Sequence, residues 1–301
     1  MNRDAIQIGF IGAGNMGGPM IRHLAAAGHA VRVSVRRPEL FSRIEALGAT
    51  AVGSPAAAAA AADFVMINVT TTADVEAVLF GKGGAAGAMA AGCVCIDFST
   101  ISPAASARFA ERLNACGVSF LDAPVSGGVR GAEAGTLSIM VGGLADALEK
   151  AGPLLRCLGE KITHIGPSGA GQVAKACNQI IQVVNIQGIA EALLYASRMG
   201  AEPARVIEAI SAGMAGSKML DLMGPKMAAR DFVAGIEARL HAKDIAMVTG
   251  TMRDLGIEMP ATEVAHRQLA RLVDLGWGHD DTSSLLRVLE AAIGGGVPRA
   301  E

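Results

Sequence analysis

The feature that most restricts this 301-residue chain is a glycine-rich turn directly after its first apolar segment. Ile6–Ile11 has the composition of a buried strand, and Gly12-Ala-Gly14-Asn-Met-Gly17 leads from it into a helical segment over Met16–Ala27. With this spacing, the first glycine permits a tight turn, the second lets a pyrophosphate approach the backbone, and the third lets the helix pack on the sheet. We therefore predict a dinucleotide-binding turn, with a close-packed turn without ligand as the alternative, formed by Gly12, Gly14, Asn15, Met16 and Gly17.

Strand and helix signals alternate through the first half of the chain. Helical signals cover Glu39–Leu47 and Pro55–Ala62, and the second follows Ser54, a residue type that caps helices. Further apolar runs predict strands at Ala30–Val35, Phe64–Val69, Cys93–Phe98, Val118–Leu121 and Ser138–Val141. Alternating strands and helices favour an α/β fold with a parallel, doubly wound sheet of the Rossmann type.

Strand signals become rare after Ile165-Gly-Pro-Ser-Gly. A long helix is predicted from Gln172 to about Arg198. Shorter helices are predicted at Pro203–Ser211, Lys218–Ala229, His241–Leu255, Thr262–Leu275 and Thr282–Ala292. We therefore expect a Rossmann domain over residues 1–166, followed by an all-α domain over residues 167–301 that serves substrate binding and oligomerisation.

The composition excludes several other classes of protein. The 26 basic and 28 acidic residues leave a net charge of −2, and one Trp and one Tyr offer few stacking surfaces, so we expect no nucleic-acid partner. The chain contains no run of eighteen apolar residues, so we expect no membrane span. Its first residues lack a signal-peptide pattern, which favours a cytoplasmic location. Five cysteines without zinc spacing and six scattered histidines predict no metal site, and Cys93 and Cys95 are expected to be buried thiols on one side of a strand.

The end of the second predicted strand bears on the choice of cofactor. An acid at this position binds the ribose 2′-hydroxyl in NAD-dependent relatives of this fold. The segment Val33-Ser-Val-Arg-Arg37 has no acid, and Ser34, Arg36 and Arg37 suit a 2′-phosphate instead. We therefore predict NADP, with NAD as the alternative if the arginines are only solvated surface charges. Val69, at the end of another strand run, is a further predicted cofactor contact.

Lys175, near the start of the long helix, is a candidate for proton transfer. Alcohol oxidation requires a base and the reverse reaction an acid, and a lysine serves both if its pKa falls toward neutrality, as burial favours. Asn178 and Gln179 lie three and four residues further on the same helical face, where carboxamides can orient substrate oxygens. From spacing alone, a lysine that extends its ammonium into solvent is equally compatible.

A second candidate segment is Asp122-Ala-Pro-Val-Ser126-Gly127-Gly128, which follows a predicted strand. A serine and successive glycines can present a hydroxyl and backbone N–H groups to an anion. We predict that Ser126, Gly127 and Gly128 bind a substrate carboxylate; the alternative is an ordinary glycine-rich loop.

The chain resembles the β-hydroxyacid dehydrogenases over about residues 6–290. Five segments occur in the family's order: Gly9–Gly17, Asp97-Phe-Ser-Thr100-Ile-Ser-Pro103, Asp122–Gly128, Gly169–Gln179 and Leu240-His-Ala-Lys243-Asp244. The resemblance implies that Lys175 is the catalytic lysine, assisted by Ser126 and Asn178, and that Gln179 contacts substrate. It places Thr100 and Lys243 near the nicotinamide, although Lys243 alone would be interpreted as a surface charge. Val35 departs from the acid or asparagine of many relatives.

The resemblance implies an oxidoreductase that interconverts a short 3-hydroxy acid and its semialdehyde. Asn178-Gln179, Ala215-Gly-Ser217 and Leu240-His241 are most similar to the branch that reduces 2-hydroxy-3-oxopropionate (tartronate semialdehyde). Alternatives are 3-hydroxyisobutyrate dehydrogenase and glyoxylate or succinic semialdehyde reductase. An imine reductase on the same scaffold usually lacks the lysine, and a non-catalytic NADP-binding interaction protein is the alternative of another class. We expect a homodimer or homotetramer.

Overall fold

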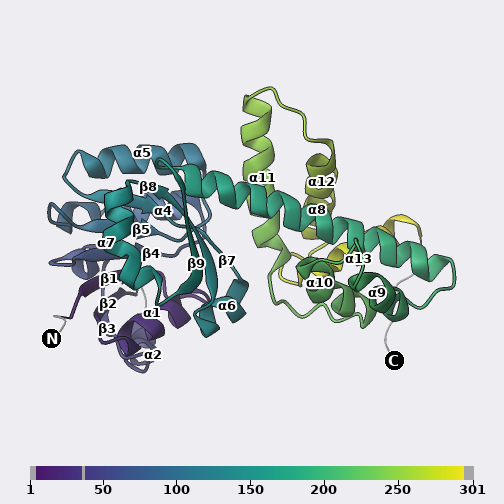
Figure 1. The fold of residues 1–301 in the computed structure, drawn as a ribbon, viewed down its shortest axis with the longest axis horizontal. Helices are drawn as coiled ribbons and strands as arrows, with labels where there is room; N and C mark the ends of the chain where they lie inside the picture. The colour runs from purple at the N-terminus through teal and green to yellow at the C-terminus, as the bar shows by residue number, and fades with distance from the viewer. Residues whose placement is uncertain (1–4, 36–37, 295–301) are drawn as a thin grey trace. The chain divides into compact units, whose positions relative to one another are not determined.

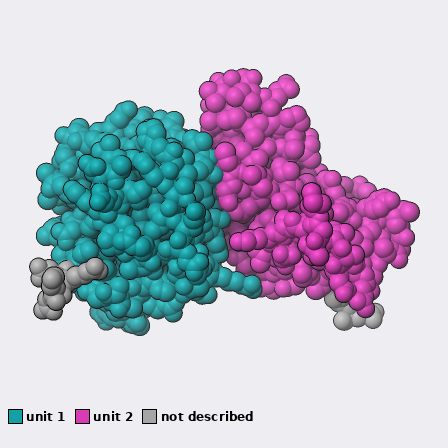
Figure 2. Space-filling view, viewed as in Figure 1, with its two compact units in different colours: residues 1–175 teal, residues 176–301 magenta. Residues whose placement is uncertain are grey.

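The computed structural model describes residues 5–35 and 38–294, which form two compact units (Figures 1 and 2). The N-terminal unit comprises residues 1–175 and the C-terminal unit residues 176–301. The division falls within one continuous helix, α8 (Ala170–Arg198), shortly after the position where the sequence predicts the domain boundary.

Within its described residues, the N-terminal unit contains one nine-stranded sheet. The strands are β1 (Gln7–Ile11), β2 (Ala30–Ser34), β3 (Thr50–Val52), β4 (Phe64–Ile67), β5 (Val94–Asp97), β6 (Ser119–Asp122), β7 (Val125–Ser126), β8 (Leu137–Gly143) and β9 (Gly159–Gly166). They are arranged in the order β3-β2-β1-β4-β5-β6-β8-β7, and β9 pairs with β8. The first six strands in this order are parallel, as predicted.

The strand order reverses between β1 and β4. The chain passes from β1 outward to β2 and β3 and then returns to form β4 on the other side of β1. Ile11 pairs with Ile67, so the turns that leave β1 and β4 begin side by side. In open α/β sheets, ligands bind at such a reversal, beyond the carboxyl ends of the strands. This carboxyl edge is where the glycine turn lies.

Helices cover both faces of the sheet, because alternate strand residues point to opposite sides. Val94 and Ile96 belong to one hydrophobic cluster, together with residues of α1 (Gly17–Ala26) and α7 (Ala145–Leu155). Cys93 and Cys95 belong to the other, together with residues of α4 (Thr72–Phe80) and α5 (Pro103–Asn114), which confirms that both thiols are buried on one side. The helices of this unit are α1 (Gly17–Ala26), α2 (Phe41–Glu45), α3 (Pro55–Ala59), α4 (Thr72–Phe80), α5 (Pro103–Asn114), α6 (Gly128–Ala134) and α7 (Ala145–Leu155), with 3₁₀ turns at Pro38–Leu40 and Ala86–Ala88.

Local sequence explains where several of these helices begin and end. Ser54 accepts a hydrogen bond from Ala57 N at 3.1 Å, and Pro55 occupies the first helical position of α3, as predicted. Thr71 and Asp74 form a capping box at α4. Gly28 follows α1 with φ +87°, a conformation that residues with a Cβ rarely adopt.

Within the described residues, the C-terminal unit contains only helices and 3₁₀ turns, apart from an isolated bridge between Glu237 and Asp281. From α8 onward they are α9 (Pro203–Ser211), α10 (Lys218–Ala228), α11 (Ala238–Asp254), α12 (Pro260–Asp274), a 3₁₀ turn at Thr282–Ser284 and α13 (Leu285–Ala292). A single hydrophobic cluster draws residues from all of these helices, with Val183, Ile186 and Leu193 on the α8 side.

Helix α8 is long and apolar enough, by length and composition, to cross a membrane. The same test is passed by core helices, and α8 supplies several fully buried residues to the cluster of the C-terminal unit. Lys175, Gln179 and Gln187 are also buried along it. Packing within the protein thus accounts for part of its hydropathy, while Ile181 and Tyr195 on the same helix are exposed.

The outer part of the sheet is not visible in the sequence pattern. Strands β3 and β7 have three and two residues, too few to show a period. Strand β9 is mostly exposed, so it lacks the apolar run that marks a buried strand. β8 is antiparallel to β6 and β7, which makes this edge of the predicted parallel sheet a mixed one.

Candidate active site

The turn after β1 is built around two glycines that cannot carry a side chain. A Cβ on Gly12, whose φ is +106°, would lie 2.0 Å from the Asn68 carbonyl oxygen. A Cβ on Gly17 would lie 1.9 Å from the Gly12 carbonyl oxygen. The first contact holds the turn against the end of β4, and the second lets α1 begin close to the sheet.

Gly14 differs, because, apart from its two chain neighbours, no atom of the described residues lies within 4 Å of the position that its Cβ would occupy. Protein packing therefore does not require this glycine, whereas a phosphate close to the backbone would. Asn15 and Met16 follow it and lead into the N-terminus of α1, a position in a helix that favours anions, although the Gly18 N–H already donates to the Gly14 carbonyl oxygen at 2.9 Å. The turn thus fits the dinucleotide pyrophosphate that its spacing predicts.

The predicted 2′-phosphate contacts lie at the end of β2. Ser34 is buried and ends the strand, and Val35 is buried immediately after it. Arg36 and Arg37 lie outside the described residues.

A hydrogen-bonded network holds the segments that leave β4 and β5. The Val69 N–H donates to the Ser99 hydroxyl oxygen at 2.9 Å, and the Ser99 N–H donates to Asp97 Oδ1 at 2.9 Å. Thr100 is half-buried and comes directly after Ser99. Two of the predicted cofactor contacts, Val69 and Thr100, are therefore attached to the same serine.

Gln172 links this network to α8. Its carboxamide accepts from the Ile101 N–H at 3.1 Å and donates to the Ser99 carbonyl oxygen at 2.8 Å. The side chain is only 1% exposed, so both bonds are shielded from water. The backbone on either side of Thr100 is thereby fixed to the helix that carries Lys175, three residues further on.

Asp122, at the end of β6, holds the first turn of α8. Its carboxylate accepts from the Gly169 N–H at 2.7 Å and from the Gln172 N–H at 2.9 Å. Burial raises the pKa of Asp122, and the hydrogen bonds from the backbone of Gly169 and Gln172 oppose this rise. A Cβ on Gly171 would lie 2.5 Å from the Met140 carbonyl oxygen, so the helix begins in direct contact with the sheet.

Lys175 lies beside the loop that the sequence assigns to the substrate carboxylate. Its side chain is 8% exposed, and Nζ donates to the Val125 carbonyl oxygen at 2.8 Å. Ser126 comes directly after Val125, and Gly127 and Gly128 come next with φ values of +137° and +62°. The ammonium is therefore not extended into solvent, the alternative that spacing alone leaves open.

The remaining candidate residues form a chain of polar contacts within the C-terminal unit. Asn178 Nδ2 donates to Gln179 Oε1 at 2.9 Å, and Gln179 Nε2 donates to Asp244 Oδ2 at 2.7 Å. Lys243 Nζ lies 3.0 Å from Asp244 Oδ1. Both ends of the Gln179 carboxamide thus contact protein groups.

His241, in the same motif, has a structural environment. It is buried, and Nδ1 lies 2.8 Å from the hydroxyl oxygen of Thr282, which is also buried. This contact agrees with a packing role for the histidine rather than a catalytic one.

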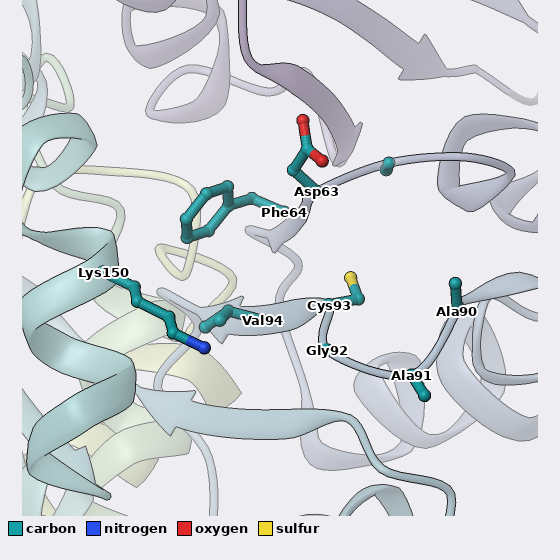
Figure 3. Close-up of a pocket in the computed structure, with 9 residues that line it drawn as sticks. Asp63, Phe64, Ala90, Ala91, Gly92, Cys93, Val94 and Lys150 are labelled. Atoms are coloured by element: carbon teal, nitrogen blue, oxygen red, sulfur yellow. The ribbon is translucent and has the colours of Figure 1, made fainter.

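A surface hollow of about 470 Å³ lies at the opposite edge of the sheet (Figure 3). It is lined by residues at the amino ends of β4 and β5 and by one residue of α7, namely 62–64, 90–94 and Lys150. We call it the amino-edge hollow. It contains none of the residues that the sequence assigns to the site. Among residues 5–35 and 38–294, no group of three or more His, Cys, Asp or Glu side chains is arranged to hold a metal ion.

The N-terminal unit thus brings together the glycine turn, Ser34, Val69, Thr100, the Ser126 loop and Lys175 along the carboxyl edge of its sheet. The C-terminal unit groups Asn178, Gln179 and Lys243. Sequence patterns alone assign no role to Gln172, Asp122 or Asp244. Only their contacts with residues far along the chain reveal a role. For the two acids the sequence does contain a signal, because Asp122 begins the segment that contains Ser126 and Asp244 directly follows Lys243.

This strand order, the open second glycine and the buried lysine define a nucleotide-dependent dehydrogenase. Two family models match: the NAD-binding domain of 6-phosphogluconate dehydrogenase over residues 7–166, and the NAD-binding domain of NADP-dependent 3-hydroxyisobutyrate dehydrogenase over residues 169–289. The chain belongs to the β-hydroxyacid dehydrogenase family and is an NAD(P)-dependent oxidoreductase.

Curated relatives and a solved structure agree with this assignment over nearly the whole chain. The chain is 40% identical over 285 residues to 2-hydroxy-3-oxopropionate reductase of Escherichia coli K12, covering 95% of this chain and 97% of the relative. It is 36% identical to 3-hydroxyisobutyrate dehydrogenase of Pseudomonas aeruginosa, covering 86% and 89%. The structure of Mycobacterium tuberculosis 3-hydroxyisobutyrate dehydrogenase with L-serine matches with a TM-score of 0.87 and 32% identity, covering 95% and 99%.

Proposed function

We propose that this enzyme reduces the aldehyde of a short 3-oxo acid with NADPH and catalyses the reverse oxidation of the 3-hydroxy acid. The first candidate substrate is 2-hydroxy-3-oxopropionate. The observation that supports the proposal most is the contact of Lys175 Nζ with the Val125 carbonyl oxygen at 2.8 Å. It puts a proton-transfer group one residue from the loop that would bind a carboxylate.

Ser126, Gly127 and Gly128 would bind the substrate carboxylate. The serine supplies a hydroxyl and the glycines supply backbone N–H groups. Apart from its two chain neighbours and the backbone of its own helix, no atom of the described residues lies within 4 Å of the position that a Cβ on Gly128 would take, so this side of the loop has room for an anion. The carboxylate then anchors the substrate beside Lys175.

Lys175 would exchange the proton that accompanies hydride transfer. In reduction its ammonium donates to the carbonyl oxygen, and in oxidation its neutral amine accepts the hydroxyl proton. Asn178, one helical turn further along α8, would orient the same substrate oxygen. The nicotinamide ring, when bound, supplies or accepts the hydride.

The proposed cofactor is NADP, with NAD as the alternative. The glycine turn would hold the pyrophosphate, Ser34, Arg36 and Arg37 the 2′-phosphate, and Val69, Thr100 and Lys243 the nicotinamide end. The absence of an acid from residues 33–37 supports NADP. Steady-state kinetics with both cofactors test this choice, and a higher kcat/KM with NADH would overturn it.

The proposed substrate rests on the higher identity with the 2-hydroxy-3-oxopropionate reductase, 40% against 36% for the 3-hydroxyisobutyrate dehydrogenase. A screen of NADPH oxidation with tartronate, methylmalonate and succinic semialdehydes and with glyoxylate tests it. We expect the highest kcat/KM with tartronate semialdehyde. A higher value with methylmalonate semialdehyde would favour the 3-hydroxyisobutyrate reaction, and no turnover with any aldehyde would contradict the proposed function.

We also propose a homodimer or homotetramer. Ile181 and Tyr195 on α8 expose 63% and 68% of their surfaces, and burial against a second copy would remove this apolar area from water. Light scattering of the purified enzyme distinguishes monomer, dimer and tetramer. The cytoplasmic location and the functional boundary between residues 166 and 167 remain predictions from the sequence.

A further inference from the structure

We propose that Gln179 and Asp244 are positioning residues that fix the direction of the Asn178 carboxamide, so that its oxygen faces a hydroxyl of the substrate. This inference rests on the proposed function, because it assigns Asn178 to the substrate. It specifies that the ligand must donate a hydrogen bond to Asn178.

The direction is imposed by Asp244. An ionised carboxylate only accepts hydrogen bonds, so the Gln179 group that contacts it at 2.7 Å must be the amide nitrogen. Asp244 is 5% exposed and Lys243 Nζ lies 3.0 Å from its other oxygen, where the ammonium balances the buried charge. The charge of Asp244 thus decides which way the Gln179 carboxamide faces.

Gln179 passes this direction on to Asn178. Because the Gln179 amide nitrogen donates to Asp244, its amide oxygen faces Asn178. The Asn178 amide nitrogen donates to this oxygen at 2.9 Å. The oxygen of Asn178 then lies on the opposite edge of the amide. An oxygen accepts hydrogen bonds, and the 3-hydroxyl of the product or the 2-hydroxyl of a 2-hydroxy-3-oxo acid donates them.

Exchanging the two chemical groups tests this relay without changing its shape. Asp244→Asn removes the group that can only accept hydrogen bonds, so the carboxamides of Gln179 and Asn178 can each rotate by about 180° and exchange the positions of oxygen and nitrogen. Gln179→Glu puts two carboxylates in contact. In the double variant, the new carboxamide at position 244 can donate to the new carboxylate at position 179. That carboxylate still accepts from Asn178, so the original direction returns.

The chain offers a matched control on the same helix. Gln187 is also buried, and its Nε2 donates to Glu191 Oε1 at 2.8 Å. Gln187→Glu therefore creates the same contact between two carboxylates. It lies eight residues beyond Gln179, about 12 Å along the helix axis. This variant measures the cost of the repulsion without an effect on Asn178.

We expect each single variant to raise the KM for the hydroxy acid by about tenfold, which corresponds to the loss of one hydrogen bond between neutral groups, here the substrate hydroxyl and the Asn178 oxygen. The double variant should return this KM to within about threefold of wild type, since contacting pairs couple strongly. The Gln179→Glu variant should also improve as the pH falls, because one proton shared by the two carboxylates restores a donor. Gln187→Glu should lower stability and leave the KM unchanged.

The relay is overturned if the double variant is as impaired as the worse single variant, or if all three retain the wild-type KM while wild type turns over substrate. Equal losses in Gln187→Glu would indicate a purely structural effect and overturn it too. If wild type reduces none of the aldehydes, the proposed function fails instead. The pairing of Gln179 with Asp244 is then judged by urea unfolding of wild type, both single variants and the double variant, and additive losses of stability would overturn it.

Discussion

The two edges of the N-terminal sheet differ in their polar contacts. At the carboxyl edge, the ends of β4, β5 and β6 are joined to α8 by hydrogen bonds of Ser99, Asp122 and Gln172. At the amino edge, β4 and β5 border a hollow of about 470 Å³ whose only cation among the lining residues is Lys150 (Figure 3). The polar contacts that join distant strand ends to α8 therefore lie at the edge that carries the candidate site.

The candidate site thus coincides with fixed polar groups and not with the amino-edge hollow. A reacting group needs a fixed position and a suitable local environment, and both come from buried hydrogen bonds. Lys175 has them: its ammonium is held at Val125, and its helix is anchored to the N-terminal unit through Gln172 and through Asp122. Lys150 and Cys93 line the amino-edge hollow instead. We therefore expect a lysine substitution to reduce activity strongly at the carboxyl edge and to leave it nearly unchanged at the amino edge.

The largest effect is expected from Lys175→Ala. Loss of the proton-transfer group should reduce kcat by about 10²- to 10⁴-fold, the usual contribution of a placed general acid or base. Cofactor affinity should stay nearly intact, because Lys175 is not among the proposed cofactor contacts. Turnover of the purified variant and its NADPH affinity by fluorescence titration measure both. Unchanged turnover would refute the proposed role.

Part of the carboxyl edge, namely the glycine turn and the start of the helix that carries Lys175, can be predicted from the sequence, because the residue patterns that mark these features are local. Gly12, Gly14 and Gly17 lie in one turn, and strand and helix signals on either side place that turn at the edge of a sheet. The start of the helix that carries Lys175 is predicted to within two residues, Gln172 against Ala170. Each of these features depends on neighbours within one or two turns of chain.

The rest depends on contacts between distant segments. In the sequence, Gln172 is one more polar residue on a helix, and only its bonds to Ser99 and Ile101, more than 70 residues away, give it a role. Gln179 is predicted to contact substrate because it shares a helical face with Lys175 and matches the family's motif. Its bond to Asp244, 65 residues away, is a contact that the sequence does not indicate. No pattern of spacing can show such a partner, since register between elements is decided by packing.

Cysteine reactivity tests the amino edge. Burial, with a smaller contribution from the charge of Asp63, raises the pKa of the Cys93 thiol to about 11. Because the thiolate is the reactive form, alkylation at pH 8 should be about 100-fold slower than for a thiol of ordinary pKa, and it should accelerate as the pH rises toward 11. Mass spectrometry after iodoacetamide treatment compares Cys93 with the exposed Cys116. Equal rates would mean that the amino-edge hollow activates its thiol and would weaken the contrast between the edges.

Gln172→Met should have an intermediate effect at the carboxyl edge. The side chain keeps its length and loses both hydrogen bonds, which leaves the Ile101 N–H and the Ser99 carbonyl oxygen without this partner. Thr100 should then move relative to α8, and kcat/KM should fall by about tenfold. Thermal unfolding gives the accompanying loss of stability. A loss of stability with unchanged kcat/KM would make Gln172 a structural residue only.

Lys150→Ala should have the smallest effect, and it is the matched counterpart of Lys175→Ala. Both replace a lysine of a helix that packs against the sheet, but α7 presents Lys150 to the amino edge (Figure 3). Substitution of an exposed side chain away from buried networks changes stability by less than about 0.5 kcal/mol. We therefore expect kcat and KM within about twofold of wild type, since the hydrogen bonds that hold Thr100 and Lys175 all lie at the carboxyl edge. A loss of turnover near that of Lys175→Ala would show that the hollow takes part in the reaction, and the contrast between the two edges would fail.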